Sequence, residues 1–181
     1  PWILSVGMMR DDKSKLASYR ILGNSLKLID KEYALLIAGN GPKKDFVEGQ
    51  LKKTIGKKVF MLGELSEIDL AKVYNCCDVF AWPGVNEAFG LSFLESQACG
   101  LPVVGGNFGG VSEVIKDSET GFLVDIDNEN IKKFSEAIQK LLDDRLLRAK
   151  MSSEAEKFIH NERSLEITAK KLHKIILKSA K

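Results

Sequence analysis

The chain has 181 residues, of which 44% are hydrophobic, so it is long and apolar enough to bury a core, and its length suits one domain. Its 27 Lys and Arg side chains nearly balance its 25 Asp and Glu side chains, for a formal charge of +2 at pH 7. This balance does not indicate nucleic acid as a partner, and the composition excludes a disordered or fibrous chain.

Other sequence features bear on where the protein works. Its three cysteines, Cys76, Cys77 and Cys99, show no CxxC spacing, which favours a reducing compartment. The sequence has no apolar run of about 18 residues and no signal peptide at its start, so we expect a cytoplasmic protein. Because the sequence begins at Pro1 without an initiator Met, we also expect a piece of a longer protein.

Short apolar segments alternate with segments of helical period as far as about Leu142. Each apolar segment is apolar nearly throughout, as in strands that are buried on both faces. The predicted strands are 2–6, 33–38, 59–62, 78–82, 102–104 and 121–124, and the predicted helices are 15–29, 43–55, 68–77, 91–98, 129–142 and 164–179. The alternation predicts an α/β fold: a doubly wound, Rossmann-like parallel sheet of about six strands, followed by a helical C-terminal segment.

In a doubly wound sheet, ligands bind beyond the carboxyl ends of the strands, so the loops that follow the strands are candidate sites. The first loop contains Gly7, Arg10 and Lys13, which suit either an anion site or a solvated turn. The second loop, 39–42, has Gly41 in a tight turn that permits close approach of a ligand. Neither a GxGxxG fingerprint nor a P-loop occurs in the sequence.

A third loop and the helix after it carry two glutamates. Glu87 follows the strand 78–82, and Glu95 lies within the predicted helix 91–98, whose first N–H groups favour a bound phosphate. The carboxylates can accept hydrogen bonds from neutral hydroxyls, so two sugars bridged by a pyrophosphate fit this arrangement. The alternative is that Glu87 caps a helix end and Glu95 is a solvated helical residue.

The sequence also resembles a known family. The segments that carry the resemblance are 87–95, with Phe89-Gly90 between the two glutamates, 98–104, 109–115 and 120–124, together with 39–42 and 78–80. They are similar to the C-terminal, donor-binding domain of retaining glycosyltransferases of the GT-B type, family 4, over nearly the whole chain. The resemblance implies a single nucleotide-sugar-binding domain, 1–181, from an enzyme whose acceptor-binding domain would precede Pro1.

The resemblance also implies roles for residues. Glu95 would bind the ribose hydroxyls of a nucleotide, Glu87 would lie close to the transferred sugar, and the backbone amides around Phe89 would hold the diphosphate. Glu87 and Lys13 are thus the candidate catalytic residues. The donor-binding candidates are Gly7, Arg10, Lys13, Gly41, Glu87, Ala88, Phe89, Gly90, Leu91 and Glu95.

The first loop departs from the family pattern. Lys13 falls at the family's lysine position, but Met8 stands where the family has an arginine after Gly7. Ser14 replaces the usual glycine after the lysine. Arg10, two residues beyond Met8, is the candidate replacement for the missing cation.

The implied mechanism is electrostatic: amides, a helix N-terminus and cations stabilise the leaving diphosphate, and neither a metal ion nor a cofactor is expected. The segment 125–127 spells D-x-D, which either binds a divalent cation or, as we favour, ends with Asp127 as the N-cap of the next helix. His160 and His173 are interpreted as helix-face residues rather than as a base or a ligand.

Two classes of function remain. The first is the donor-binding half of a glycosyltransferase that moves a sugar from a nucleotide-diphosphate sugar to an acceptor sugar, glycan or lipid-linked glycan. The isolated chain would then bind the nucleotide but transfer no sugar, because it lacks the half that orients an acceptor and excludes water. The second is a non-catalytic module that binds a nucleotide or a sugar phosphate.

The last predicted helix, 164–179, places lysines beside an apolar stripe. A basic amphipathic helix can dock on anionic lipid, which would put the protein at the periphery of the cytoplasmic membrane. The alternative, which we favour, is that the lysines are solvated and the apolar stripe packs on the domain. The lysines are Lys170, Lys171, Lys174, Lys178 and Lys181.

Overall fold

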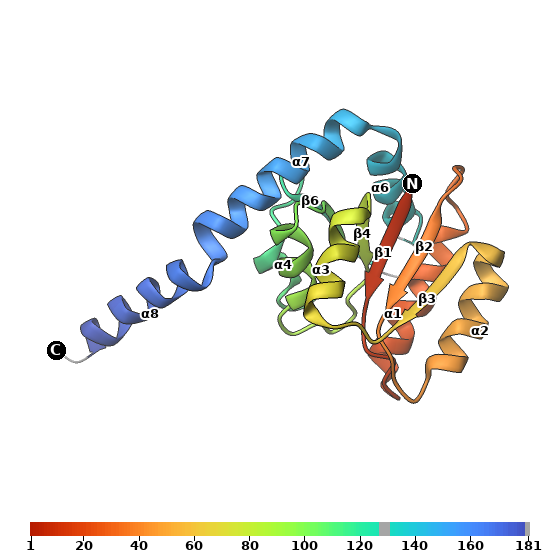
Figure 1. Ribbon diagram of the computed structural model, residues 1–181, viewed down its shortest axis with the longest axis horizontal. Helices are drawn as coiled ribbons and strands as arrows, with labels where there is room; N and C mark the ends of the chain where they lie inside the picture. Colours follow the sequence, from red (N-terminus) through yellow and green to blue (C-terminus); the bar gives the residue numbers. More distant parts are fainter. Residues whose placement is uncertain (127–130, 180–181) are drawn as a thin grey trace.

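The computed structural model describes residues 1–126 and 131–179. Six parallel strands form one sheet in the order β3-β2-β1-β4-β5-β6 (Figure 1). The strands are β1 (Trp2–Val6), β2 (Ala34–Ala38), β3 (Val59–Gly63), β4 (Val79–Trp82), β5 (Val103–Gly106) and β6 (Gly121–Val124). Because the strand order reverses direction between β1 and β4, the predicted doubly wound parallel sheet is confirmed.

Helices flank the sheet on both faces. The helices are α1 (Lys13–Leu26), α2 (Lys44–Ile55), α3 (Glu67–Cys76), α4 (Leu91–Ala98), α5 (Val111–Val114), α6 (Ile131–Asp143), α7 (Arg145–Phe158) and α8 (Leu165–Ser179), with a 3₁₀ turn at Gly56–Lys58. α1 packs against α2 and α6 on one face, and α4 packs beside α3 on the other (Figure 1). α7 was not predicted. The predicted start of the helix 129–142 and the predicted cap at Asp127 lie outside the described residues.

The middle of the sheet is buried on both faces. Leu4 on β1, Phe80 on β4 and Val104 on β5 have no exposed surface. Phe80 meets Phe93 of α4 edge to face, with 5.3 Å between ring centroids, which fixes α4 against the sheet. This rigid packing sets the position of the loop and helix that carry the two glutamates.

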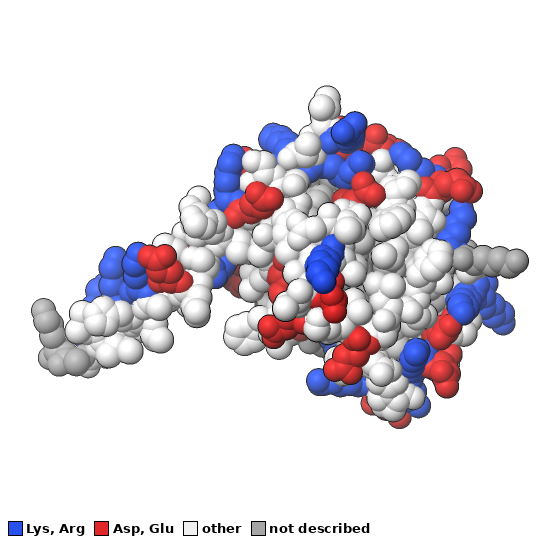
Figure 2. Space-filling view, in the orientation of Figure 1, with Lys and Arg blue, Asp and Glu red and all other residues white. Residues whose placement is uncertain are grey.

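One face of β1, β2 and β3 is open instead. Trp2 and Phe60 are 49% and 52% exposed, and with Leu36 and Leu62 they line an apolar groove of about 340 Å³. In Figure 1 the three strands face the viewer, and Figure 2 shows white, uncharged surface over them. The prediction of strands buried on both faces is therefore wrong here, because α3 packs beside α4 rather than over β2 and β3.

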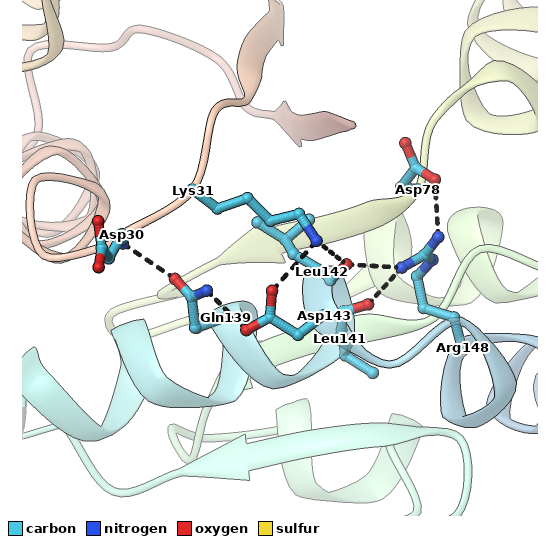
Figure 3. A network of polar contacts seen from close by, with 8 residues as sticks. All are labelled: Asp30, Lys31, Asp78, Gln139, Leu141, Leu142, Asp143 and Arg148. Atoms are coloured by element: carbon cyan, nitrogen blue, oxygen red, sulfur yellow. Dashed lines mark hydrogen bonds and ion pairs between the residues drawn. The ribbon is translucent and has the colours of Figure 1, made fainter.

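Cations close the corner where α6 ends and α7 begins (Figure 3). Lys31 Nζ donates to the carbonyl of Leu142 at 2.8 Å, and Arg148 Nη1 donates to the carbonyls of Leu141 and Leu142 at 2.7 and 3.0 Å. Positive charges thus satisfy the last carbonyl groups of α6, where the helix dipole is negative. Arg148 Nη2 also lies 3.4 Å from Asp78 Oδ1, just before β4, so this corner lies at the amino edge of the sheet.

The C-terminal helix α8 projects from the body of the protein (Figure 1). A π-helical turn, Ile159–Arg163, joins it to α7, and Arg163 Nη2 donates to the carbonyl of Glu113, which fixes the direction of the turn. Leu172, Ile175 and Ile176 remain 56%, 60% and 56% exposed. The expectation that the apolar stripe packs on the domain is therefore wrong, because the turn directs α8 away from the sheet. Within the described residues, no helix is both long and apolar enough to cross a membrane.

Candidate functional site

The loops after β1, β2 and β4 meet at the carboxyl edge of the sheet and enclose a cleft of about 420 Å³. The residues that line it are Val6, Gly7, Met8, Arg10, Lys15, Gly39, Glu87, Ala88, Phe89, Leu91, Ser92 and Glu95. The structure thus brings most of the predicted donor-binding residues together. The predicted residues Lys13, Gly41 and Gly90 are described but stand outside the lining of this cleft.

The first two loops interlock. Met9 N donates to the carbonyl of Asn40 at 2.9 Å, and a Cβ added to Gly41, whose φ is +151°, would stand 2.5 Å from the carbonyl oxygen of Met9. Gly41 therefore contributes by letting the loops touch. The Tyr19 hydroxyl donates to the carbonyl of Gly7 at 2.7 Å, and burial raises the pKa of this phenol well above its usual value, so it stays a donor. The path of the first loop is fixed on both sides.

The cations of the first loop take different places. Arg10 is exposed and lines the cleft, whereas Lys13 is an exposed residue at the start of α1 and stands outside the lining. Met8, at the position of the family's arginine, also lines the cleft and is 42% exposed. Arg10 is thus the cationic residue of the first loop that lines the cleft.

Glu87 is held by α1. Its Oε2 lies 2.9 Å from Lys15 Nζ, and these side chains are 22% and 26% exposed. Lys15 was absent from the sequence-derived candidates, because α1 and the Glu87 loop are 72 residues apart in the chain. A lysine near the first turn of a helix that follows a glycine loop was the available signal. Glu87 therefore carries a hydrogen-bonded counterion rather than capping a helix.

The N-terminus of α4 lies between the two glutamates. Its N-cap is Gly90, with φ +72°, which has no side chain to accept a hydrogen bond from this first turn. The N–H groups of such a turn carry partial positive charge, which suits a phosphate oxygen. Phe89 and Leu91, on either side of Gly90, are 72% and 61% exposed. The turn is therefore open to a ligand.

Glu95 is exposed on α4 and accepts a hydrogen bond of 3.1 Å at Oε2 from the Tyr74 hydroxyl of α3. Burial, and then the negative charge of Glu95, raise the pKa of the Tyr74 phenol well above its usual value, so the phenol stays protonated. Tyr74 was missed because its contact joins two helices. Tyr74 thus orients Glu95. The alternative, in which Glu95 is only a solvated helical residue, did not predict this contact.

The other candidates lie elsewhere. Asp125 accepts a hydrogen bond from Asn107 Nδ2 at 2.8 Å, while Asp127 lies outside the described residues. The described residues contain no group of three or more His, Cys, Asp or Glu side chains arranged to hold a metal ion. His160 and His173 are exposed on the π-helical turn and on α8, as expected for helix-face residues.

A doubly wound sheet with an open helix N-terminus between two carboxylates at its carboxyl edge defines a Rossmann-like domain with a candidate phosphate site. The chain belongs to the family described as "Glycosyl transferases group 1", whose profile matches residues 1–158. It has the fold of the C-terminal domain of these GT-B transferases.

Three similar proteins illustrate the match. A GDP-mannose-dependent monoacylated alpha-(1-6)-phosphatidylinositol monomannoside mannosyltransferase from Corynebacterium glutamicum is 33% identical over 149 residues, which are 78% of this chain and 38% of the relative. Sucrose-phosphate synthase from Thermosynechococcus elongatus has a TM-score of 0.86 at 25% identity, and the match covers 100% of this chain and 46% of the synthase chain. The C-terminal domain of a glycosyl transferase group 1 family protein, LpcC, from Francisella tularensis has a TM-score of 0.74 at 20% identity, and the match covers 91% of this chain and 87% of the LpcC domain. The chain thus spans less than half the length of the first two proteins.

Proposed function

We propose that residues 1–181 form the donor-binding domain of a retaining glycosyltransferase, which transfers a sugar from a nucleotide-diphosphate sugar to an acceptor hydroxyl. The observation that carries the proposal is the cleft at the carboxyl edge, where Glu87 and Glu95 flank the open N-terminus of α4. Membership of the family and a relative that depends on GDP-mannose support it.

The chemistry follows from the charges around the cleft. The N–H groups at the start of α4 and the Arg10 guanidinium would stabilise the negative charge that grows on the leaving diphosphate. Glu95, oriented by Tyr74, would accept hydrogen bonds from the ribose hydroxyls. Glu87 would accept hydrogen bonds from the transferred sugar, and Lys13 would approach the diphosphate from the start of α1.

The acceptor belongs to the part of the enzyme that we propose precedes Pro1. That domain would bind an acceptor sugar, glycan or lipid-linked glycan and would close over the cleft. In the 181-residue chain the cleft is open to water, so a bound donor has no oriented hydroxyl to attack it. The chain alone would bind the donor without transferring its sugar.

Calorimetric titration of the chain with UDP, GDP and ADP, and with the matching monophosphates, tests the proposal. We expect one diphosphate to bind more tightly than its monophosphate, because the second phosphate reaches the N-terminus of α4. Failure of all three diphosphates to bind would refute the proposed function. Sugar transfer by the purified chain to any acceptor would refute the division of labour between the two domains.

Variants of the first loop test which cation acts on the diphosphate. Because Arg10 lines the cleft and Lys13 stands outside it, Arg10→Ala should weaken the diphosphate more than Lys13→Ala does. Either loss should shrink at high salt, because an exposed charge pair is screened. An Arg10 variant that binds the diphosphate like the wild type would leave Lys13 and the helix N-terminus as the diphosphate site.

A further inference from the structure

Lys15 is the cationic residue of the cleft that no motif explains. Its Nζ lies 2.9 Å from Glu87 Oε2 and 5.8 Å from the centroid of the Trp82 ring. Trp82 is buried and meets Tyr19 edge to face, with 4.8 Å between ring centroids. The ammonium group is therefore placed between a fixed aromatic ring and the carboxylate, with its stem anchored on α1.

The same end of α1 holds the rest of the turn that leads to Glu87. Ser18 Oγ accepts a hydrogen bond of 3.0 Å from Val85 N, and Ser14 Oγ accepts one of 3.0 Å from Asn86 Nδ2. Asn86 has a φ of +54°, in the left-handed region that residues other than glycine seldom adopt. Ser14, Lys15 and Ser18 thus act together, and the serine that replaces the family's glycine has a definite contact.

A carboxylate in this cleft needs a nearby cation for an electrostatic reason. The cleft that contains Glu87 also presents the N-terminus of α4, where the diphosphate would bind. Two anions in one partly buried cleft repel each other, and the repulsion would turn the carboxylate outward or weaken the donor. A cation hydrogen-bonded to one carboxylate oxygen offsets that repulsion and leaves the other oxygen to accept a hydrogen bond from a sugar hydroxyl.

We infer that Lys15 is a positioning residue for sugar recognition: it holds the Glu87 carboxylate in place beside the diphosphate, so that the carboxylate selects the sugar-bearing donor over the bare nucleotide. The inference rests on the proposed function. Lys15 acts here through Glu87, whereas the cation of the leaving group comes from the first loop. The cations of the cleft thus have two different roles: Lys15 positions Glu87, and the first-loop cation stabilises the leaving diphosphate.

The test is to measure the affinities of UDP and UDP-glucose, and of GDP and GDP-mannose, by calorimetry, and to use the pair that the wild type binds. Lys15→Met should weaken the nucleotide sugar about tenfold while the nucleoside diphosphate changes less than about twofold, as for one lost charge-assisted contact. Lys15→Arg, which keeps the charge, should retain most of the preference for the sugar. In a Glu87→Gln background, Lys15→Met should have no further effect, because the residue acts through Glu87.

Lys43→Met is the matched control. Lys43 also lies beyond a strand at this edge and pairs with Asp11 at 3.1 Å, so its loss removes the same charge without touching Glu87. Both affinities should then stay unchanged. Equal losses of diphosphate and nucleotide sugar in Lys15→Met, or additive losses in the double variant, would overturn the inference alone. A wild type that binds no diphosphate would refute the proposed function and, with it, the inference.

Discussion

The two glutamates of the cleft depend on different neighbours, and their losses should therefore differ. Glu95→Ala removes an acceptor of hydroxyl hydrogen bonds, and it should weaken a nucleoside diphosphate and its monophosphate equally, by about 1.5 to 3 kcal/mol. Tyr74→Phe should cause a smaller loss in the same direction, because it frees the Glu95 carboxylate from a 3.1 Å hydrogen bond. Calorimetry with both nucleotides checks this. A loss that depends on the number of phosphates would place Glu95 at the diphosphate instead.

Substitution of two glycines, Gly39 and Gly49, distinguishes the effect of a required backbone geometry from the general effect of replacing glycine with alanine. Gly39 has φ +135°, and an added Cβ would overlap the carbonyl oxygen of Gly7 in the neighbouring loop, so Gly39→Ala should lower the free energy of unfolding by about 2 to 4 kcal/mol. Gly49 lies exposed within α2 with open space around it, so Gly49→Ala should raise that free energy by about 0.5 to 1 kcal/mol. Urea titration of both variants measures the difference, and equal effects would mean that the loops do not interlock.

The predicted loops gave the location of the cleft but not the partners of its carboxylates. Gly7, Arg10 and Glu87 could be placed from sequence because parallel strands end at one edge of a sheet. Lys15 and Tyr74 could not, because they reach Glu87 and Glu95 across 72 and 21 residues, through helix orientations that no local pattern encodes. Periodicity shows which elements exist, whereas contacts between elements depend on how they pack.

Among the elements, α8 should be dispensable for folding. No described residue of this helix is buried, so removal of residues 165–181 should change the free energy of unfolding by less than about 1 kcal/mol. Phe158→Ala, at the end of α7, removes a side chain that is only 4% exposed and should cost about 3 to 5 kcal/mol. Urea titration of both proteins checks this. A truncated chain as unstable as the Phe158 variant would show that α8 is held to the domain in solution.

The elements that prediction missed share a physical cause. The six strands and α4 stand out because they are short, apolar and bounded by glycine or proline. α7 does not, because only Met151, Ala155 and Phe158 are buried and Leu146, next to its N-terminus, is 83% exposed. Likewise, the sequence predicts that the open face of β1 to β3 is buried, because an apolar strand has the same pattern whether or not a helix covers it.

For the molecule as a whole, stability should fall at alkaline pH. Burial raises the pKa of the Cys77 thiol from 9.0 to about 12, and that of the Tyr33 phenol from 10.0 to about 12. Both groups stay protonated in the folded protein after the unfolded chain has lost these protons. Their contribution is therefore complete below about pH 9 and is lost as the pH rises towards 12.

Urea titrations between pH 8 and about pH 11 measure this decline, which should be reversible on return to pH 8. Cys77→Ala should remove the part that begins near pH 9, since the alanine has no proton to lose. Cys76→Ala should lessen that part only slightly, because burial outweighs the negative charge of Cys76 among the causes of the raised Cys77 pKa. A wild-type stability that does not change over this range would contradict the assignment.

The interlocked first loop also decides how this protein can be modified. Its backbone is anchored by Gly7, which accepts the Tyr19 hydrogen bond, and by the buried Met9, which is bonded to the second loop. Met8 and Arg10, on either side of Met9, are exposed and line the cleft. Substitutions at positions 8 and 10 should therefore change the surface of the cleft without moving the loop backbone. In evolution, the cation of this loop could pass from position 8 to position 10 while the fold stays the same.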